Sequence, residues 1–112
     1  MAQVINITNL PGQTAQQFQG YLYGDVQVSF FVSATPPGRG PSLHTHPYAE
    51  VFVIQAGSLT FVVGAEIVEA TAGQIIVVPA EVPHKFTNTG SVVAQHMDIH
   101  TSGQMQTTWL EE

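Results

Sequence analysis

Three of the five histidines in this 112-residue chain lie in two short sequence blocks that also contain acidic residues. The first block is Gly38-x5-His44-x-His46-x3-Glu50-x6-Gly57, in which two histidines stand two positions apart. Successive residues of a β-strand point to opposite faces, so both imidazoles face the same way and form a chelating pair. Glu50 begins the next apolar run, and we expect its carboxylate to project into the same interior.

The second block, Gly73-x5-Pro79-x-Glu81-x2-His84-x3-Asn88, again places a histidine at the start of a predicted strand. The chain contains no cysteine. Any metal that it binds must therefore be held by imidazole and carboxylate groups, which suit divalent first-row metals.

Together, the two blocks resemble the paired sequence motifs of the cupin superfamily. The 15 residues between them, Ser58–Ala72, resemble the separation found in its smallest microbial members, and the resemblance covers about Pro36–Thr101. One position departs from the pattern, because the second motif usually has glycine where this chain has Glu81. Glycine there serves a tight turn before the histidine strand, and Val82-Pro83 is the alternative that would set this turn.

The resemblance implies an all-β fold, a double-stranded jelly-roll barrel, formed by a single domain over residues 1–112 with its motif-bearing core at about 36–101. It also implies one divalent transition metal (Mn, Fe, Ni, Cu or Zn) with a specific ligand set: His44, His46, Glu50 and His84. The chemistry agrees, because three neutral imidazoles and one carboxylate around a divalent metal give a site of charge about +1. Two coordination positions stay open if the metal is six-coordinate.

A third group of polar residues lies on the last long predicted strand, where His96, Asp98 and His100 alternate with Met97 and Ile99. The three polar side chains therefore share one face. If that face is the barrel interior, His96 or His100 could act as a general base, contact the substrate, or orient a metal ligand. If it faces outward, they form a solvated stripe.

Apolar residues near the two blocks are candidates for the walls of a substrate pocket, with core packing as the alternative. They are Phe52, Ile54, Phe86, Phe30 and Val32. Tyr48 either caps the site or braces the bend after His46. The loop Pro36–Pro41 directly precedes the first block and is expected to form the rim of the site.

The elements that position these residues are predicted to be short strands, because runs rich in Val, Ile, Phe and Thr alternate with Gly, Pro or Asn every eight to twelve residues. A tight hairpin is expected at Gly64-Ala65, and a positive φ at Gly57. Helical turns are expected at most at Gln13–Phe18 and Gln104–Glu111. The expected strands are Val4–Ile7, Tyr21–Tyr23, Val26–Ala34, Ser42–His46, Glu50–Gln55, Ser58–Val63, Ile67–Ala70, Ile75–Val78, His84–Asn88 and Val92–Thr101.

Composition restricts the partners. The formal net charge is −6, and the only bases are Arg39 and Lys85. Without a basic patch, neither nucleic acid nor an anionic membrane is an expected partner. The N-terminal residues lack the pattern of a signal peptide, so we expect a cytoplasmic protein. So few bases also favour a neutral or phenolic small-molecule ligand over a phosphorylated one.

Two classes of function remain open. The resemblance implies a metal-dependent oxygenase, similar to quercetinase-like dioxygenases, in which Glu50 also transfers a proton from a substrate hydroxyl. A metal-dependent isomerase or lyase is a variant of this hypothesis. The other class is a metal- and ligand-binding protein without turnover. We also expect a homodimer, because the Val51/Val53 face and Val26–Ala34 offer more apolar surface than one barrel needs.

Overall fold

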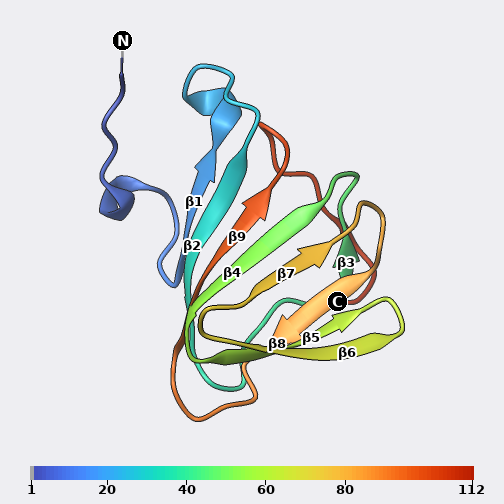
Figure 1. Ribbon diagram of the computed structural model, residues 1–112. Helices are drawn as coiled ribbons and strands as arrows, with labels where there is room; N and C mark the ends of the chain where they lie inside the picture. Colours follow the sequence, from blue (N-terminus) through green and yellow to red (C-terminus); the bar gives the residue numbers. More distant parts are fainter. Residues whose placement is uncertain (1) are drawn as a thin grey trace.

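The computed structural model describes residues 2–112 and consists mainly of short antiparallel strands (Figure 1). Two single 3₁₀ turns, η1 (Ile7–Asn9) and η2 (Gly20–Leu22), interrupt them. The strands are β1 (Ala15–Gln19), β2 (Ser29–Thr35), β3 (His44–Thr45), β4 (Glu50–Ala56), β5 (Ser58–Val63), β6 (Glu66–Thr71), β7 (Ile75–Val78), β8 (His84–Thr87), β9 (Ala94–His100) and β10 (Thr108–Trp109).

The strands form two five-stranded sheets. One sheet has the order β1-β2-β9-β4-β7 and the other β10-β3-β8-β5-β6, and every pairing is antiparallel. Figure 1 shows the first sheet running across the molecule above the second. This arrangement is the predicted jelly-roll barrel.

The glycine predictions are confirmed. Gly64 has φ 58° in the tight hairpin that joins β5 to β6, where Val63 pairs with Glu66. Gly57 has φ 77°, and a Cβ at this position would lie 3.0 Å from the Ala94 Cα. The chain needs glycine there both for the left-handed backbone and for the close approach to β9.

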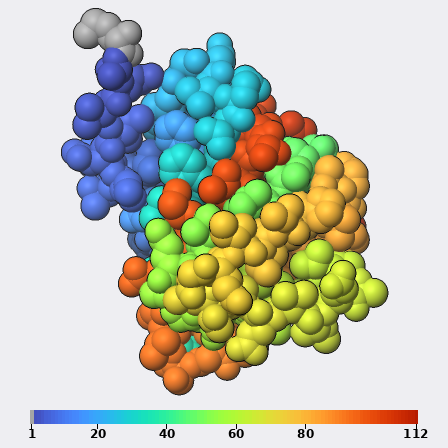
Figure 2. All heavy atoms as spheres, in the orientation of Figure 1, coloured from blue at the N-terminus to red at the C-terminus, as the bar shows by residue number. Residues whose placement is uncertain are grey.

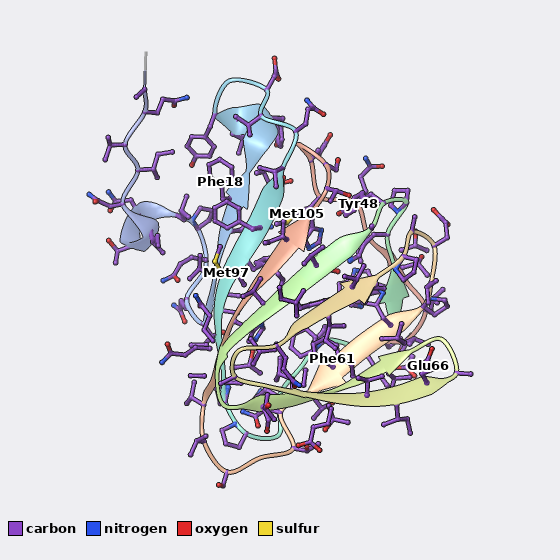
Figure 3. The ribbon with its side chains drawn as sticks, viewed as in Figure 1. Phe18, Tyr48, Phe61, Glu66, Met97 and Met105 are labelled. Carbon is purple, nitrogen blue, oxygen red and sulfur yellow. The ribbon has the colours of Figure 1, made fainter. Side chains whose placement is uncertain are left out.

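The hydrophobic core lies between the two sheets, where strand alternation directs apolar side chains inward. Phe61 is fully buried there and is labelled in Figure 3. The buried core residues are Phe52, Ile54, Leu59, Phe61, Ala70, Val78, Phe86 and Ala94. Because the motif strands β4 and β8 contribute Phe52 and Phe86, the same packing that stabilises the barrel also fixes the metal-ligand candidates on these strands.

The two expected helical turns are wrong. Within Gln13–Phe18 the chain forms β1 instead, with Ala15 pairing with Ser33 and Phe18 with Phe30. Within Gln104–Glu111 it forms β10, which pairs with β3. In both segments the edge of an existing sheet supplies backbone partners, and this tertiary pairing overrides weak local preference.

Two expected strands are also wrong. The backbone of Val4–Ile7 pairs with no strand, and Val4 is 96% exposed. Tyr21–Tyr23 contains the turn η2, closed by a hydrogen bond from the Tyr23 N–H to the Gly20 carbonyl. The other expected strands occur, with their ends shifted by up to a few residues.

The N-terminal segment covers part of the outer face of the first sheet. Figure 2 shows it against one flank of the molecule. Phe30 and Val32 lie under this segment, around a space of about 500 Å³ that Ile7, Leu10 and Met97 also line. The prediction that Phe30 and Val32 wall the interior is therefore wrong, because strand alternation turns both outward and turns Phe31, between them, inward. None of the helices in residues 2–112 has the length and apolar character needed to cross a membrane.

Candidate metal centre

Three neighbouring elements bring the predicted ligands together. His44 on β3 pairs with His84 on β8, His46 follows β3, and Glu50 begins β4. All four side chains are buried, and one ligand atom from each lies within 4.8 Å of the others. The spacing of the two sequence blocks thus corresponds to one compact donor cluster.

The main chain fixes the orientation of all three imidazoles. His44 Nδ1 lies 2.6 Å from the Ser42 carbonyl oxygen, His46 Nδ1 2.7 Å from that of Gln106, and His84 Nδ1 2.9 Å from that of Val82. A carbonyl oxygen only accepts, so each Nδ1 carries the hydrogen and donates it. In the neutral rings the three Nε2 lone pairs are then free to bind a metal, the arrangement that hydrogen-bonded metal-binding histidines show.

Within residues 2–112, the centre of the cluster contains no positively charged group that would balance these metal-binding atoms. Glu50 Oε1 lies 3.1 Å from the Nε2 atoms of both His46 and His84. His46 Nε2 is buried and makes no properly oriented hydrogen bond within residues 2–112, despite its short distance to the carboxylate. Electron-rich nitrogen and oxygen atoms this close require a proton or a metal between them. The residues present therefore fit one divalent transition metal.

The second oxygen of Glu50 is held from the other side. His100 Nε2 donates to Glu50 Oε2 over 3.1 Å, and His100 Nδ1 lies 2.5 Å from the Tyr48 hydroxyl. The Tyr48 oxygen in turn accepts from the Gln106 N–H over 3.1 Å. This chain of hydrogen bonds leaves Glu50 Oε1 to face the imidazoles, so His100 orients the carboxylate ligand.

The cluster shifts the pKa values of its members in opposite directions. Burial alone would raise the pKa of Glu50, but the imidazoles of His100, His46 and His84, each with Nε2 3.1 Å from a carboxylate oxygen, together hold it well below its usual range. Burial and the neighbouring imidazoles lower the pKa of His44. Burial opposes protonation of His46 too, yet its contacts with Glu50 and Gln106 raise its pKa. The carboxylate is thus ionised, as a metal ligand must be.

The turn before β8 keeps the shape that glycine normally provides. Glu81 adopts φ 69°, in the left-handed region, and its N–H donates to the His46 carbonyl over 2.8 Å. Glu81 itself takes the left-handed conformation that glycine would provide, and the Val82 N–H closes the turn onto the Pro79 carbonyl over 3.4 Å. At the end of the block, Asn88 has a structural role: its side chain donates to the Thr35 and Val92 carbonyls and accepts from the Gly90 N–H.

A pocket of about 970 Å³ opens beside the cluster and includes His44, His46, Glu50 and His100 in its wall. Its apolar lining contains the predicted Phe52 and Phe86, together with Phe31, Met105 and Trp109. Ile54 is buried in the core and does not line the pocket. Tyr48 stacks on His46, with ring centroids 5.2 Å apart. It therefore braces the bend after His46, which is one of the two roles expected for it.

The side chains of His96, Asp98 and His100 face the barrel interior. All three are buried, whereas Met97 and Ile99 between them are only half-buried. The solvated-stripe alternative for this face is therefore excluded. Only Asp98 and His100 line the pocket, since His96 is 1% exposed and lies behind them.

Sequence reasoning missed several residues of the pocket. Phe31 and Ser33 line the pocket, whereas Phe30 and Val32 of the same strand were predicted to do so, because strand alternation alone does not show which of its two faces is the inner one. Trp109 was overlooked because β10 becomes visible only when it pairs with β3 and brings the indole within 4.9 Å of the His44 ring. No local pattern of the sequence indicated this contact.

Comparison with known proteins agrees with the geometry. A family model described as a cupin domain matches residues 31–100. Protein SchB of Streptomyces halstedii is 37% identical over 65 residues, which make up 57% of this chain and 47% of that protein. The chain therefore spans about half the length of this curated relative.

Solved structures share the fold at low sequence identity. Oxalate decarboxylase from Bacillus subtilis superposes with a TM-score of 0.82 at 18% identity, covering 98% of this chain and 33% of that one. A structure of oxalate oxidase gives 0.80 at 17% identity, with 96% and 63% covered. A further structure of the decarboxylase, described for its Mn(II) centres, gives 0.78 at 17% identity, with 89% and 29% covered.

Proposed function

Because the chain belongs to the cupin family, we propose that it is a metal-dependent dioxygenase that acts on a small neutral or phenolic molecule, with His44, His46, Glu50 and His84 as the metal ligands. The observation that carries this proposal is the convergence of three Nε2 atoms and one carboxylate oxygen beside a largely apolar pocket. When bound, a divalent transition metal supplies a Lewis acid for a substrate oxygen and a centre that can handle dioxygen.

Glu50 is the group best placed to move a proton. It is ionised, it lines the pocket, and its Oε1 faces the centre of the cluster while His100 holds Oε2. Oε1 would have to exchange the metal for the hydrogen of a substrate hydroxyl, and His100 would keep the carboxylate in place through Oε2 during this exchange. Phe31, Phe52 and Phe86 exclude water from the same space.

The charge of the pocket favours a neutral substrate over a small dicarboxylate. Glu50 and Asp98 both line it, and the only cation in its wall is Arg39, which is exposed at the rim. Apart from the metal itself, a substrate with two carboxylates would face these two acidic groups with one exposed counter-charge. The proposed substrate is therefore unlike the oxalate named for the structural neighbours.

The test begins with elemental analysis of untagged protein purified without chelators or a nickel column. We expect about one manganese, iron, nickel or copper per chain, and dioxygen uptake with at least one phenolic or enediol compound. His44→Ala and His84→Ala should fold and lose the metal. Product without dioxygen uptake would indicate an isomerase or lyase, and metal without any product would indicate a binding protein. Parental metal content in both variants would refute the ligand set.

We also propose that the protein is a homodimer. On the outer face of the first sheet, Val51 and Val53 lie beside Ile75 and Val77, which are 62% and 61% exposed. The N-terminal segment covers the neighbouring surface at Phe30 and leaves this part open. A second copy would remove the open part from water. Light scattering should give twice the 12.0 kDa chain mass, and Val77→Asp should lower it; a parental species of 12.0 kDa would refute the dimer.

A further inference from the structure

Three side chains form a row across the first sheet, directly beside the row that contains the metal-ligand candidate Glu50. Asp98 on β9 pairs with Phe31 on β2 and with Phe52 on β4, so the carboxylate lies between two aromatic side chains that point the same way. All three line the pocket. The next inward-facing residue of β9 is His100, about 7 Å further along the strand.

Asp98 is held from behind by a chain of hydrogen bonds. His96 Nδ1 lies 2.5 Å from Asp98 Oδ1, and His96 Nε2 lies 2.8 Å from the Thr35 hydroxyl oxygen. A carboxylate accepts, so His96 donates from Nδ1, while its Nε2 is hydrogen-bonded to the Thr35 hydroxyl. His96 and Thr35 thereby fix both the position and the direction of the Asp98 carboxylate.

This arrangement leaves a hydrogen-bond acceptor in the pocket wall. Asp98 is 5% exposed, and within residues 2–112 its Oδ2 makes no hydrogen bond. Thr35, which is hydrogen-bonded to His96, also lines the pocket. Because Asp98 lines the pocket, its Oδ2 is a free acceptor in the wall, and the wall is complementary to a ligand that brings a donor.

We propose that Asp98, positioned by His96 and Thr35 and flanked by Phe31 and Phe52, is a binding subsite for a hydroxyl group on an aromatic ligand. The rings of Phe31 and Phe52 contact the ligand's apolar surface, and the ligand hydroxyl donates to Asp98 Oδ2. If the ligand is a substrate, this inference rests on the proposed function. If the protein binds the ligand without converting it, the subsite does not depend on that function. Thr35 and His96 are positioning residues, since they act through Asp98.

The electrostatics of the site agree with this assignment. Burial raises the pKa of Asp98, and the nearby negative charge of Glu50 acts in the same direction, whereas the hydrogen bond from His96 opposes the rise. A donor from a ligand would replace the solvation that the buried carboxylate has lost. A second carboxylate in the ligand would do the opposite.

The test compares two probes that differ by the hydroxyl hydrogen alone. 2-Naphthol and 2-methoxynaphthalene are titrated by NMR into the protein as purified, in anaerobic buffer so that no oxidation occurs. The parent should bind 2-naphthol at least about tenfold more tightly than its methyl ether, since a hydrogen bond to a buried carboxylate has this magnitude. Asp98→Asn should reduce the preference to about twofold, and Thr35→Val should reduce it while leaving the affinity for the ether unchanged.

Asp25→Asn is the matched control, because it makes the same change at an exposed turn and should keep the full preference. Equal affinity of the two probes for the parent would overturn the proposal. An undiminished preference in Asp98→Asn would also overturn it, because the hydroxyl would then bind elsewhere, for instance at the metal. If neither probe binds, Phe31 and Phe52 do not form a binding site for an aromatic ligand, and the proposal is refuted. Loss of metal with the preference retained would instead count against the proposed function.

Discussion

Replacing His100 should weaken metal binding although His100 is not one of the four proposed ligands. His100 Nε2 donates to Glu50 Oε2 over 3.1 Å, and both side chains are 4% exposed. His100→Phe keeps a ring of similar shape and removes the donor. The carboxylate then has no partner for Oε2 and can turn Oε1 away from the imidazoles.

The magnitude follows from the strength of this bond. A hydrogen bond to a buried charged group contributes about 1.5–3 kcal/mol. Because the bond exists with and without metal, only the part that orients Oε1 appears in the metal affinity. We therefore expect affinity to fall about tenfold, or ~1.4 kcal/mol, at the lower end of the range for residues that orient metal ligands.

The assay uses the only tryptophan of the chain. The Trp109 ring centroid lies 4.9 Å from that of His44, so its fluorescence should report metal binding. Metal-free protein is titrated with Zn²⁺ in competition with a chelator of known affinity. Two further variants separate orientation from packing: His100→Gln retains an N–H donor and should recover most of the affinity, and Tyr48→Phe removes only the far end of the chain and should cost a few-fold.

The reasoning is refuted if His100→Phe folds and binds Zn²⁺ within about twofold of the parent. It is also refuted if His100→Gln is as weak as His100→Phe. In that case the loss would come from the ring itself and not from the donor that it offers to Glu50.

Three further changes test the fold around the site. Glu81→Gly should raise the free energy of unfolding by about 0.5–1 kcal/mol, because it relieves a left-handed residue at φ 69° and loses part of the gain to unfolded-state entropy; an unchanged urea midpoint would count against strain at this turn. In the metal-free protein, Glu50 has a pKa below its unfolded value of 4.5. The ionised Glu50 therefore stabilises the folded protein above pH 4.5, and this contribution is lost progressively as the pH falls below 4.5 toward the folded-state pKa. Glu50→Gln should reduce the acid slope by up to about 1.4 kcal/mol per pH unit, measured by urea unfolding between pH 5 and 3, and equal slopes would contradict the assignment. Asn88→Ala should destabilise the protein by about 2–3 kcal/mol, since it leaves the carbonyls of Thr35 and Val92 without their donor, and a calorimetric loss under 1 kcal/mol would show that water replaces it.

The candidate metal centre could be predicted from the sequence because its geometry is mostly local. Strand alternation alone places His44 and His46 on one face, and the two blocks each begin a strand. The pairing of His44 with His84 then joins them. Before the structure, only the resemblance to the cupin superfamily joined the two blocks into one ligand set, because this pairing connects residues 40 positions apart.

The remaining errors concern segments that depend on distant partners. Ala15–Gln19 contains no β-branched residue and becomes a strand only by pairing with β2. Likewise, nothing near Phe30 shows that residues 5–10 will cover it, so its apolar character wrongly suggested the interior. His100 lay on the predicted polar face, but its contact with Glu50 requires β9 to lie beside β4.

The source of the imidazole hydrogen bonds determines which mutations can disturb the centre. His44, His46 and His84 all donate to main-chain carbonyls, which remain when Ser42, Gln106 or Val82 is replaced by another residue. Glu50 instead depends on the side chain of His100 for its orientation. The orientation of the three nitrogen ligands is thus protected against most single substitutions around them. Among the residues around the ligands, we expect position 100 to have the main influence on metal affinity and selectivity.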